Sequence, residues 1–128
     1  MTYYTSKTLE GSIASLRPRV EAALRAEGFG VLTEIDVSAT MKKKLDEDIP
    51  PYLILGACNP ALALRSIKAE DKIGLMLPCN VIMRDASEGR VEVAAVDPMA
   101  SMQAVTNPAL AEVATEVQAK LARVIAAL

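Results

Sequence analysis

The chain has 128 residues and a net charge of -2, and 52% of its residues are apolar while 23% are charged. This size favours one domain over residues 1–128 with a single hydrophobic core, and the apolar content excludes a disordered chain. The charge balance excludes nonspecific nucleic-acid binding, because neutralising phosphates requires a clustered excess of Lys and Arg.

The N-terminal part of the chain predicts a strand followed by a helix. Residues 2–7 are rich in Tyr and Thr, which favour strands. Ser12 suits the N-cap of a helix whose apolar residues recur at helical spacing as far as the stop at Gly28. Pro18 falls inside that helix, so we expect either a kink or a regular helix that begins near Arg17.

The next segment predicts a second strand and a short helix. Residues 31–37 alternate well enough for a strand with one wet face. Ser38 suits the N-cap of a helix over residues 38–50, in which three lysines precede three acids. This order opposes the helix dipole and marks the segment as a candidate flap, whereas the simpler interpretation is a solvated helix face.

The middle of the chain predicts two apolar strands around a helix. Residues 52–55 are apolar without alternation, which is typical of a strand covered on both faces. Asn59 and Pro60 suit the N-cap and first position of a helix that reaches about residue 68. Residues 73–84 read as a long strand in which Pro78 marks a bulge or an edge site, because proline cannot donate to a ladder.

The C-terminal part predicts a hairpin and a long helix. Residues 90–96 pair with the preceding strand through a turn at Gly89, and Asn107 with Pro108 caps an amphipathic helix that runs to the end. Five strands and two main helices predict a two-layer α+β sandwich in which both helices cover one face of a five-stranded sheet.

Three segments carry a family resemblance, and they occur in the order Gly56-Ala-Cys-Asn-Pro60, Gly74-Leu-Met-Leu-Pro-Cys-Asn-Val81 and Asp97-Pro98. On these residues the chain resembles the domain of unknown function 302 family over essentially its whole length. The resemblance implies a β-α-β(4)-α arrangement with a curved, mostly antiparallel sheet and short helical inserts, and it implies homodimers. It supplies neither an activity nor a cofactor, so both stay unknown at this point.

The least ordinary residues lie in the two Cys-Asn segments, Cys58-Asn59-Pro60 and Pro78-Cys79-Asn80. Cys58 precedes a predicted helix N-terminus, where free amides and the dipole favour an anion, so a reactive thiolate is expected there. Cys58 is therefore our first candidate for a nucleophile or a soft-metal ligand. The alternative is a buried cysteine that acts as a small hydrophobe.

The distance between the two thiols depends on topology. Parallel neighbouring strands would set Cys58 opposite Cys79. In the antiparallel arrangement that the resemblance implies, Cys58 pairs near Ile73 and Cys79 near Tyr52, which separates the thiols by on the order of 20 Å. A shared site would then require a dimer contact. Desolvation in an apolar strand is expected to raise the pKa of Cys79.

The absence of histidine removes several classes of enzyme and metal site. Serine-hydrolase triads, cysteine–histidine dyads and the usual zinc hydrolases all require an imidazole. The cysteines are separated by 20 intervening residues and form no CxxC motif, so no metal site is predicted and enzymatic activity stays an open question.

We expect a cytoplasmic protein that makes no contact with membranes. The N-terminus lacks the apolar stretch of a secretory signal. The longest uncharged run, residues 49–64, is short and broken by prolines, so it predicts no membrane span. Two cysteines in such a compartment are expected to be free thiols.

The leading hypothesis is a small, dimeric ligand-binding module with a site bounded by the two Cys-Asn segments and covered by the flap at residues 38–50. The candidate ligand-binding residues are Asn59, Pro60, Pro78, Cys79 and Asn80, which on the simpler interpretation only satisfy broken backbone. The rival hypotheses are a thiol-dependent enzyme or thiol carrier that uses Cys58, and a protein interaction module that uses an exposed face of the sheet.

Overall fold

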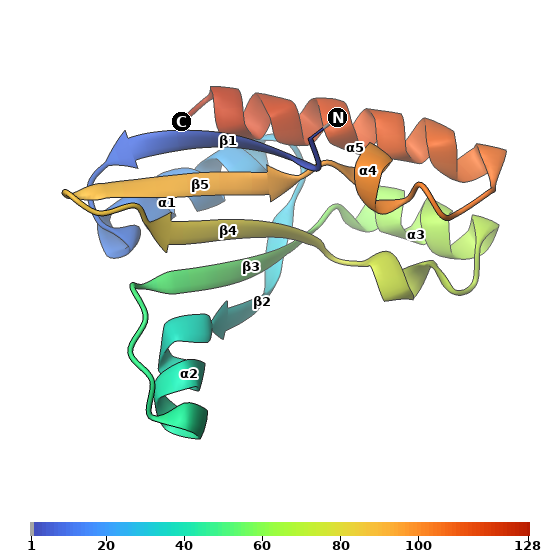
Figure 1. Cartoon of the computed structure of the whole chain (residues 1–128). Helices are drawn as coiled ribbons and strands as arrows, with labels where there is room; N and C mark the ends of the chain where they lie inside the picture. The colour runs from blue at the N-terminus through green and yellow to red at the C-terminus, as the bar shows by residue number, and fades with distance from the viewer. Residues whose placement is uncertain (1) are drawn as a thin grey trace.

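The structure, a computed structural model, describes residues 2–128 (Figure 1). Its strands form one sheet in the order β1-β5-β4-β3-β2, and every neighbouring pair is antiparallel. The strands are β1 (Tyr4–Glu10), β2 (Gly30–Asp36), β3 (Tyr52–Cys58), β4 (Cys79–Asp85) and β5 (Arg90–Val96). The predicted two-layer α+β sandwich is confirmed.

Helices cover one face of the sheet and leave the other open. The helices within residues 2–128 are α1 (Ile13–Ala26), α2 (Val37–Leu45), α3 (Pro60–Ala69), α4 (Pro98–Ser101) and α5 (Pro108–Ala126), with a 3-10 turn η1 (Ile73–Met76), and the two long ones, α1 and α5, cover the face. In Figure 1, α1 and α5 lie on the far side of the sheet. Within residues 2–128, no helix is long and apolar enough to cross a membrane.

The core lies between that covered face and the two long helices. Its members with no more than 1% of their surface exposed come from both layers, and they include Val20, Leu24, Leu55, Val81, Val93, Leu121 and Val124. Burial of such aliphatic side chains contributes about 1.5–3 kcal/mol each and holds the layers together.

The first helix begins where the sequence predicts. Ser12 Oγ accepts a hydrogen bond from the Ser15 amide at 3.0 Å, and Ser15 Oγ accepts one from the Ser12 amide at 3.0 Å, which is a capping box. Pro18 lies inside α1, which is helical from Ile13 onward, so the later start near Arg17 is wrong.

The charge order expected for the second helix is wrong. Asp36, not Ser38, caps α2, and its carboxylate accepts a hydrogen bond from the Ala39 amide at 2.9 Å. The helix ends at Leu45, so its three lysines occupy the last turn, where they favour the helix dipole. The acids follow the helix end, and Asp46 lies 3.0 Å from Lys42.

The expected flap does not cover the cysteines. α2 lies beside the N-terminal end of β3, where Ser38 Oγ accepts a hydrogen bond from the Tyr52 amide at 3.2 Å. Cys58 is the last residue of the same seven-residue strand, about 20 Å away at the rise per strand residue. In Figure 1, α2 projects from the lower edge of the sheet.

The apolar segment at 73–84 is not one strand. Residues 73–76 form η1, a cis peptide joins Leu77 to Pro78, and β4 begins only at Cys79. Pro78 therefore precedes the ladder and does not interrupt it. Because proline has no amide proton to donate to a ladder, this position just before the strand costs no hydrogen bond.

The third strand is covered on one face, not two. Leu53, Leu55 and Ala57 are buried against the helices, whereas Tyr52 and Ile54 alternate onto the open face and are half-buried. A run of apolar residues thus places apolar side chains on a face that no helix covers.

Candidate functional site

The two Cys-Asn segments meet in the fold. In the ladder between β3 and β4, Ala57 pairs with Cys79 and Gly56 pairs with Asn80, so Cys58 and Cys79 are close neighbours. The expected separation on the order of 20 Å is therefore wrong. It assumed that a strand begins at Ile73, but η1 takes up the first residues of that segment and the register moves.

The space between the two cysteines is too small for an organic ligand. Cys58, Asn59, Pro78 and Cys79 line a cavity of about 30 Å³ beneath α3 and α5, and most of its other lining residues are apolar. Such a volume holds about one water molecule. This cavity does not form the binding site that the sequence predicts between these segments.

Cys58 lacks the amide donor expected for a thiolate. The side chain is half-buried and carries no disulfide. Within residues 2–128 no hydrogen bond reaches its sulfur, and the nearby Leu62 amide donates instead to Asn59 Oδ1 at 3.3 Å. The helix dipole alone remains to favour an anion, so the physical basis for a nucleophile is weak.

Cys79 is a buried thiol with a raised pKa. Burial raises its pKa to about 11, and the neighbouring Cys58 contributes in the same direction. The predicted direction is confirmed, because a charged sulfur in this apolar surrounding would lose its hydration.

Asn59 and Pro60 have structural roles in starting α3. The Asn59 carboxamide caps the helix and also donates to the Glu27 carbonyl at 3.4 Å, and Pro60 occupies the first helical position. Gly28 has a φ of 84°, and a Cβ there would stand 2.9 Å from Asn59 Nδ2. These contacts support the simpler interpretation of this segment.

The missing side chain of Gly56 leaves room for Pro78 and Thr33 to lie against β3. A Cβ on Gly56 would lie 2.2 Å from Thr33 Oγ1 and 2.8 Å from Pro78 Cγ. Position 56 has the parity of Ile54 along β3, so these two side chains fold over the open face at one end of the strand.

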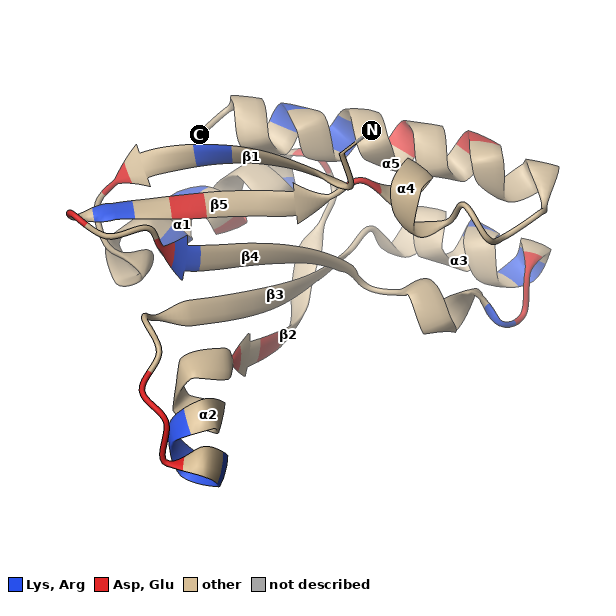
Figure 2. Ribbon diagram, in the orientation of Figure 1, with Lys and Arg blue, Asp and Glu red and all other residues tan. Residues whose placement is uncertain are grey.

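The open face carries a larger hollow that sequence reasoning missed. It has a volume of about 560 Å³ and is lined by Tyr3, Tyr4, Tyr52, Asn80, Ile82, Arg84, Glu92, Ala94, Ala95 and Val96. Of the predicted site residues only Asn80 lines it. On β4 and β5 the charged residues are confined to the end near the turn that joins the two strands (Figure 2).

The polar groups of this hollow differ in their partners. Arg84 Nε donates to Glu92 Oε1 at 2.7 Å across the β4–β5 pair. Asn80 is exposed, and within residues 2–128 its carboxamide makes no hydrogen bond. The Tyr3 and Tyr4 rings meet edge to face with centroids 5.1 Å apart. The register Tyr52–Arg84 and Arg84–Glu92 brings these side chains together from three strands.

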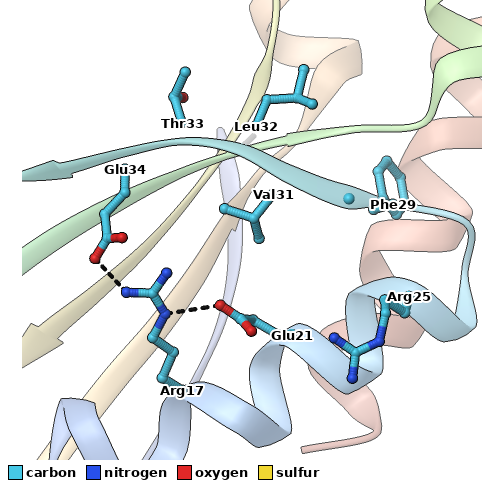
Figure 3. Close-up of a pocket in the computed structure, with 9 residues that line it drawn as sticks. Arg17, Glu21, Arg25, Phe29, Val31, Leu32, Thr33 and Glu34 are labelled. Atoms are coloured by element: carbon cyan, nitrogen blue, oxygen red, sulfur yellow. Dashed lines mark hydrogen bonds and ion pairs between the residues drawn. The ribbon is translucent and has the colours of Figure 1, made fainter.

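A second hollow of about 390 Å³ lies between α1 and β2 (Figure 3). Arg17 bridges the carboxylates of Glu21, at 2.9 Å, and Glu34. The hydrogen bond from Arg17 to Glu34 lowers the pKa of the Glu34 carboxyl group. The hydrogen bonds to Glu34 and Glu21 raise the pKa of Arg17. Within residues 2–128, no three His, Cys, Asp or Glu side chains are grouped as a metal site.

Comparison with known proteins gives a family but no activity. The crystal structure of an uncharacterized conserved protein from Bacillus stearothermophilus, which carries the DUF302 domain, is similar to this chain at 25% identity and a TM-score of 0.90. The similarity covers 99% of this chain and 98% of that one. No curated protein matches the chain. The sequence model of the domain of unknown function DUF302 matches residues 5–128, and the chain therefore belongs to the DUF302 family.

Proposed function

We propose that the protein is a small ligand-binding module whose site is the hollow on the open face of the sheet. The observation that carries the proposal is the apolar floor of this hollow. Ile82, Ala94 and Val96 occupy positions that antiparallel sheets with one wet face normally give to polar residues.

The lining favours an amphipathic ligand with a flat apolar body. A volume of about 560 Å³ lies within the range of small-molecule sites. Tyrosine rings beside an aliphatic floor suit an aromatic group, and the carboxamide of Asn80, which has no partner among residues 2–128, offers both a donor and an acceptor. The ion pair of Arg84 and Glu92 at the charged end adds polar selectivity.

The proposal is tested with 8-anilino-1-naphthalenesulfonate, an aromatic anion whose fluorescence rises in apolar sites. We expect saturable binding at a single site, with amide shifts in an NMR spectrum concentrated at residues 80–84 and 92–96. Ile82→Glu should abolish this binding, and Asn80→Ala should weaken it several-fold without lowering the denaturation midpoint. Native mass spectrometry of freshly purified protein would detect a ligand that remains bound.

Matched controls separate this site from other exposed apolar residues. Leu45 on α2 and Leu75 in η1 are 65% and 83% exposed. Leu45→Glu and Leu75→Glu should leave the affinity for the dye unchanged. Equal loss of binding in all three glutamate variants, or shifts scattered over the surface, would contradict a specific site on the open face.

We also propose that the protein is a homodimer through an apolar surface on α3 and η1. Leu64, Ile67, Leu75 and Met76 are 53%, 49%, 83% and 40% exposed on two elements in contact with each other. Exposed apolar side chains gathered in this way are typical of interaction surfaces. Sedimentation should show a dimer that Leu75→Glu dissociates and Leu45→Glu does not. A dimer dissociated by Ile82→Glu instead would assign the open face to the second copy and refute both proposals.

The two free cysteines favour a reducing compartment, so a cytoplasmic location forms part of the proposal. Thiol chemistry at Cys58 has less support than ligand binding, because no amide within residues 2–128 donates to its sulfur.

A further inference from the structure

The free edge of β2 is an exposed template for another strand. β2 is the last strand in the sheet order and pairs only with β3. In an antiparallel pair every second residue turns its amide and carbonyl away from its neighbour. Apart from the ladder with β3, no hydrogen bond within the described chain reaches the backbone of residues 30–35. β2 is bulged between Val31 and Thr33, so the edge keeps unused donors and acceptors on either side of the bulge.

A groove runs beside this edge with α1 as its other wall. Arg17, Glu21 and Arg25 recur every four residues along one side of α1 and face residues 29–34 across about 390 Å³ (Figure 3). From Arg17 to Arg25 the helix rises about 12 Å, which is close to the length of four strand residues. The groove is therefore long enough for three side chains that alternate along one extended segment.

The groove differs in charge between its two ends. The Arg17 guanidinium is neutralised by Glu21 and Glu34. The Arg25 guanidinium makes no ion pair with any described residue, and no dashed line reaches it in Figure 3. Val31 points into the groove between the two ends. The lining thus offers a cation at one end, an apolar position in the middle and carboxylates at the other end.

We propose that β2 binds an extended peptide segment of another protein, which adds to the sheet as a sixth strand and sets an acidic side chain against Arg25. In this recognition mode the main-chain hydrogen bonds give affinity and the alternate side chains give specificity. The peptide places an acidic residue at Arg25, an apolar residue two positions on at Val31, and an uncharged or basic residue at Glu34.

A second copy of the chain is the rival occupant of this edge. β2 carries Glu34 and Asp36 and no basic residue. In an antiparallel pair of two copies centred on Thr33, Glu34 of each copy would lie opposite Leu32 of the other, so the acids would not face each other. The hydrogen-exchange experiment below separates this occupant from a peptide, because protection by a second copy needs no peptide and depends on protein concentration.

The test uses a nine-residue peptide of alternating threonine and valine with one glutamate near its end. Binding to the isotope-labelled full chain is followed by NMR. We expect amide shifts and slowed hydrogen exchange at residues 30–36. Methylation of alternate peptide nitrogens removes the ladder donors and should abolish binding, and lysine in place of the glutamate should weaken it about tenfold.

The matched variants lie on the same helix. Arg25→Glu should weaken binding of the glutamate peptide at least about tenfold and reverse the preference in favour of the lysine peptide. Arg19 is exposed on α1 outside the groove, so Arg19→Glu should change the affinity less than about twofold. Both substitutions change the net charge equally, which isolates the position of the charge.

Three results would overturn the proposal. One is an affinity that is the same for the methylated and unmethylated peptides. Another is an equal loss of binding in the Arg25 and Arg19 variants. The third is a β2 edge whose amides are protected from exchange without peptide in a concentration-dependent manner, because that result would assign the edge to a second copy. None of these outcomes depends on ligand binding at the open face.

Discussion

Substitution of Gly56 by alanine tests the close approach of Thr33 and Pro78 over the open face. The new Cβ would lie 2.2 Å from Thr33 Oγ1 and 2.8 Å from Pro78 Cγ, both well inside the normal contact distance of about 3.5–4.0 Å. Pro78 has a rigid ring and Thr33 a branched side chain, so neither relieves the overlap by a simple rotation. We therefore expect the ladder between β2 and β3 to shift.

The magnitude follows from two opposing terms. Inserting a methyl group into a filled site costs about 1–3 kcal/mol. Replacing glycine by alanine also lowers the entropy of the unfolded chain, which returns about 0.4–1 kcal/mol. The net loss of unfolding free energy should be about 1–2 kcal/mol, which for a domain of this size lowers the melting temperature by roughly 4–8 °C.

The assay is urea denaturation of Gly56→Ala beside two comparison variants. Gly74→Ala has no heavy atom within 4 Å of its new Cβ and should change the free energy by no more than about 0.5 kcal/mol. Adding Thr33→Ala to Gly56→Ala removes the nearer clash and should restore about 1 kcal/mol. A Gly56→Ala midpoint equal to that of Gly74→Ala, or no recovery in the double variant, would refute the reasoning.

Three further predictions concern the site and its supports. At pH 8 iodoacetamide should modify Cys58 well before Cys79, and stability from the neutral Cys79 thiol should be complete below its unfolded pKa near 9.0 and be lost as the pH rises towards 11. Asn59→Ala should lower the unfolding free energy by about 1 kcal/mol, and Asn59→Asp, which keeps the capping oxygen, by less. Arg17 lowers the pKa of Glu34, so the ion pair stabilises the folded state above pH 4.5 and this stabilisation is lost in more acid solution. Between pH 5 and 3 the Glu34→Gln variant should therefore lose less stability than the wild type.

Local chemistry explains which elements could be predicted. Ser12, Asn59 and Asn107 each satisfy a backbone amide within three residues, so their helix starts are visible in the sequence. The match of the family model to residues 5–128 confirms the resemblance, and two of its motifs contain the helix starts Asn59-Pro60 and Asp97-Pro98. The hairpin of β4 and β5 could also be predicted, because it depends on one short turn.

The candidate site was harder to predict because it depends on register. The apolar residues from Ile73 suit a strand as well as a 3-10 turn, and only packing decides, with Ile73 1% exposed and Leu75 83% exposed. The open-face hollow joins Tyr52, Arg84 and Glu92, which meet only after three strands are aligned. The sequence contained one signal of the open face. Residues 52–55 are all apolar, and a strand that helices cover on one face only must turn half of its side chains to the uncovered face.

The pairing of β1 with β5 has a consequence for the order of folding. Tyr4 lies opposite Val96, which is 92 positions later. Lys7 Nζ donates a hydrogen bond to the backbone oxygen of Leu128 at 2.7 Å, just beyond the end of α5. In a growing chain β1 therefore has no partner until β5 has been synthesised. Contacts so distant along the chain are slow to form. An unpaired strand exposes a row of amides and carbonyls, so β1 carries a risk of aggregation for as long as β5 is missing.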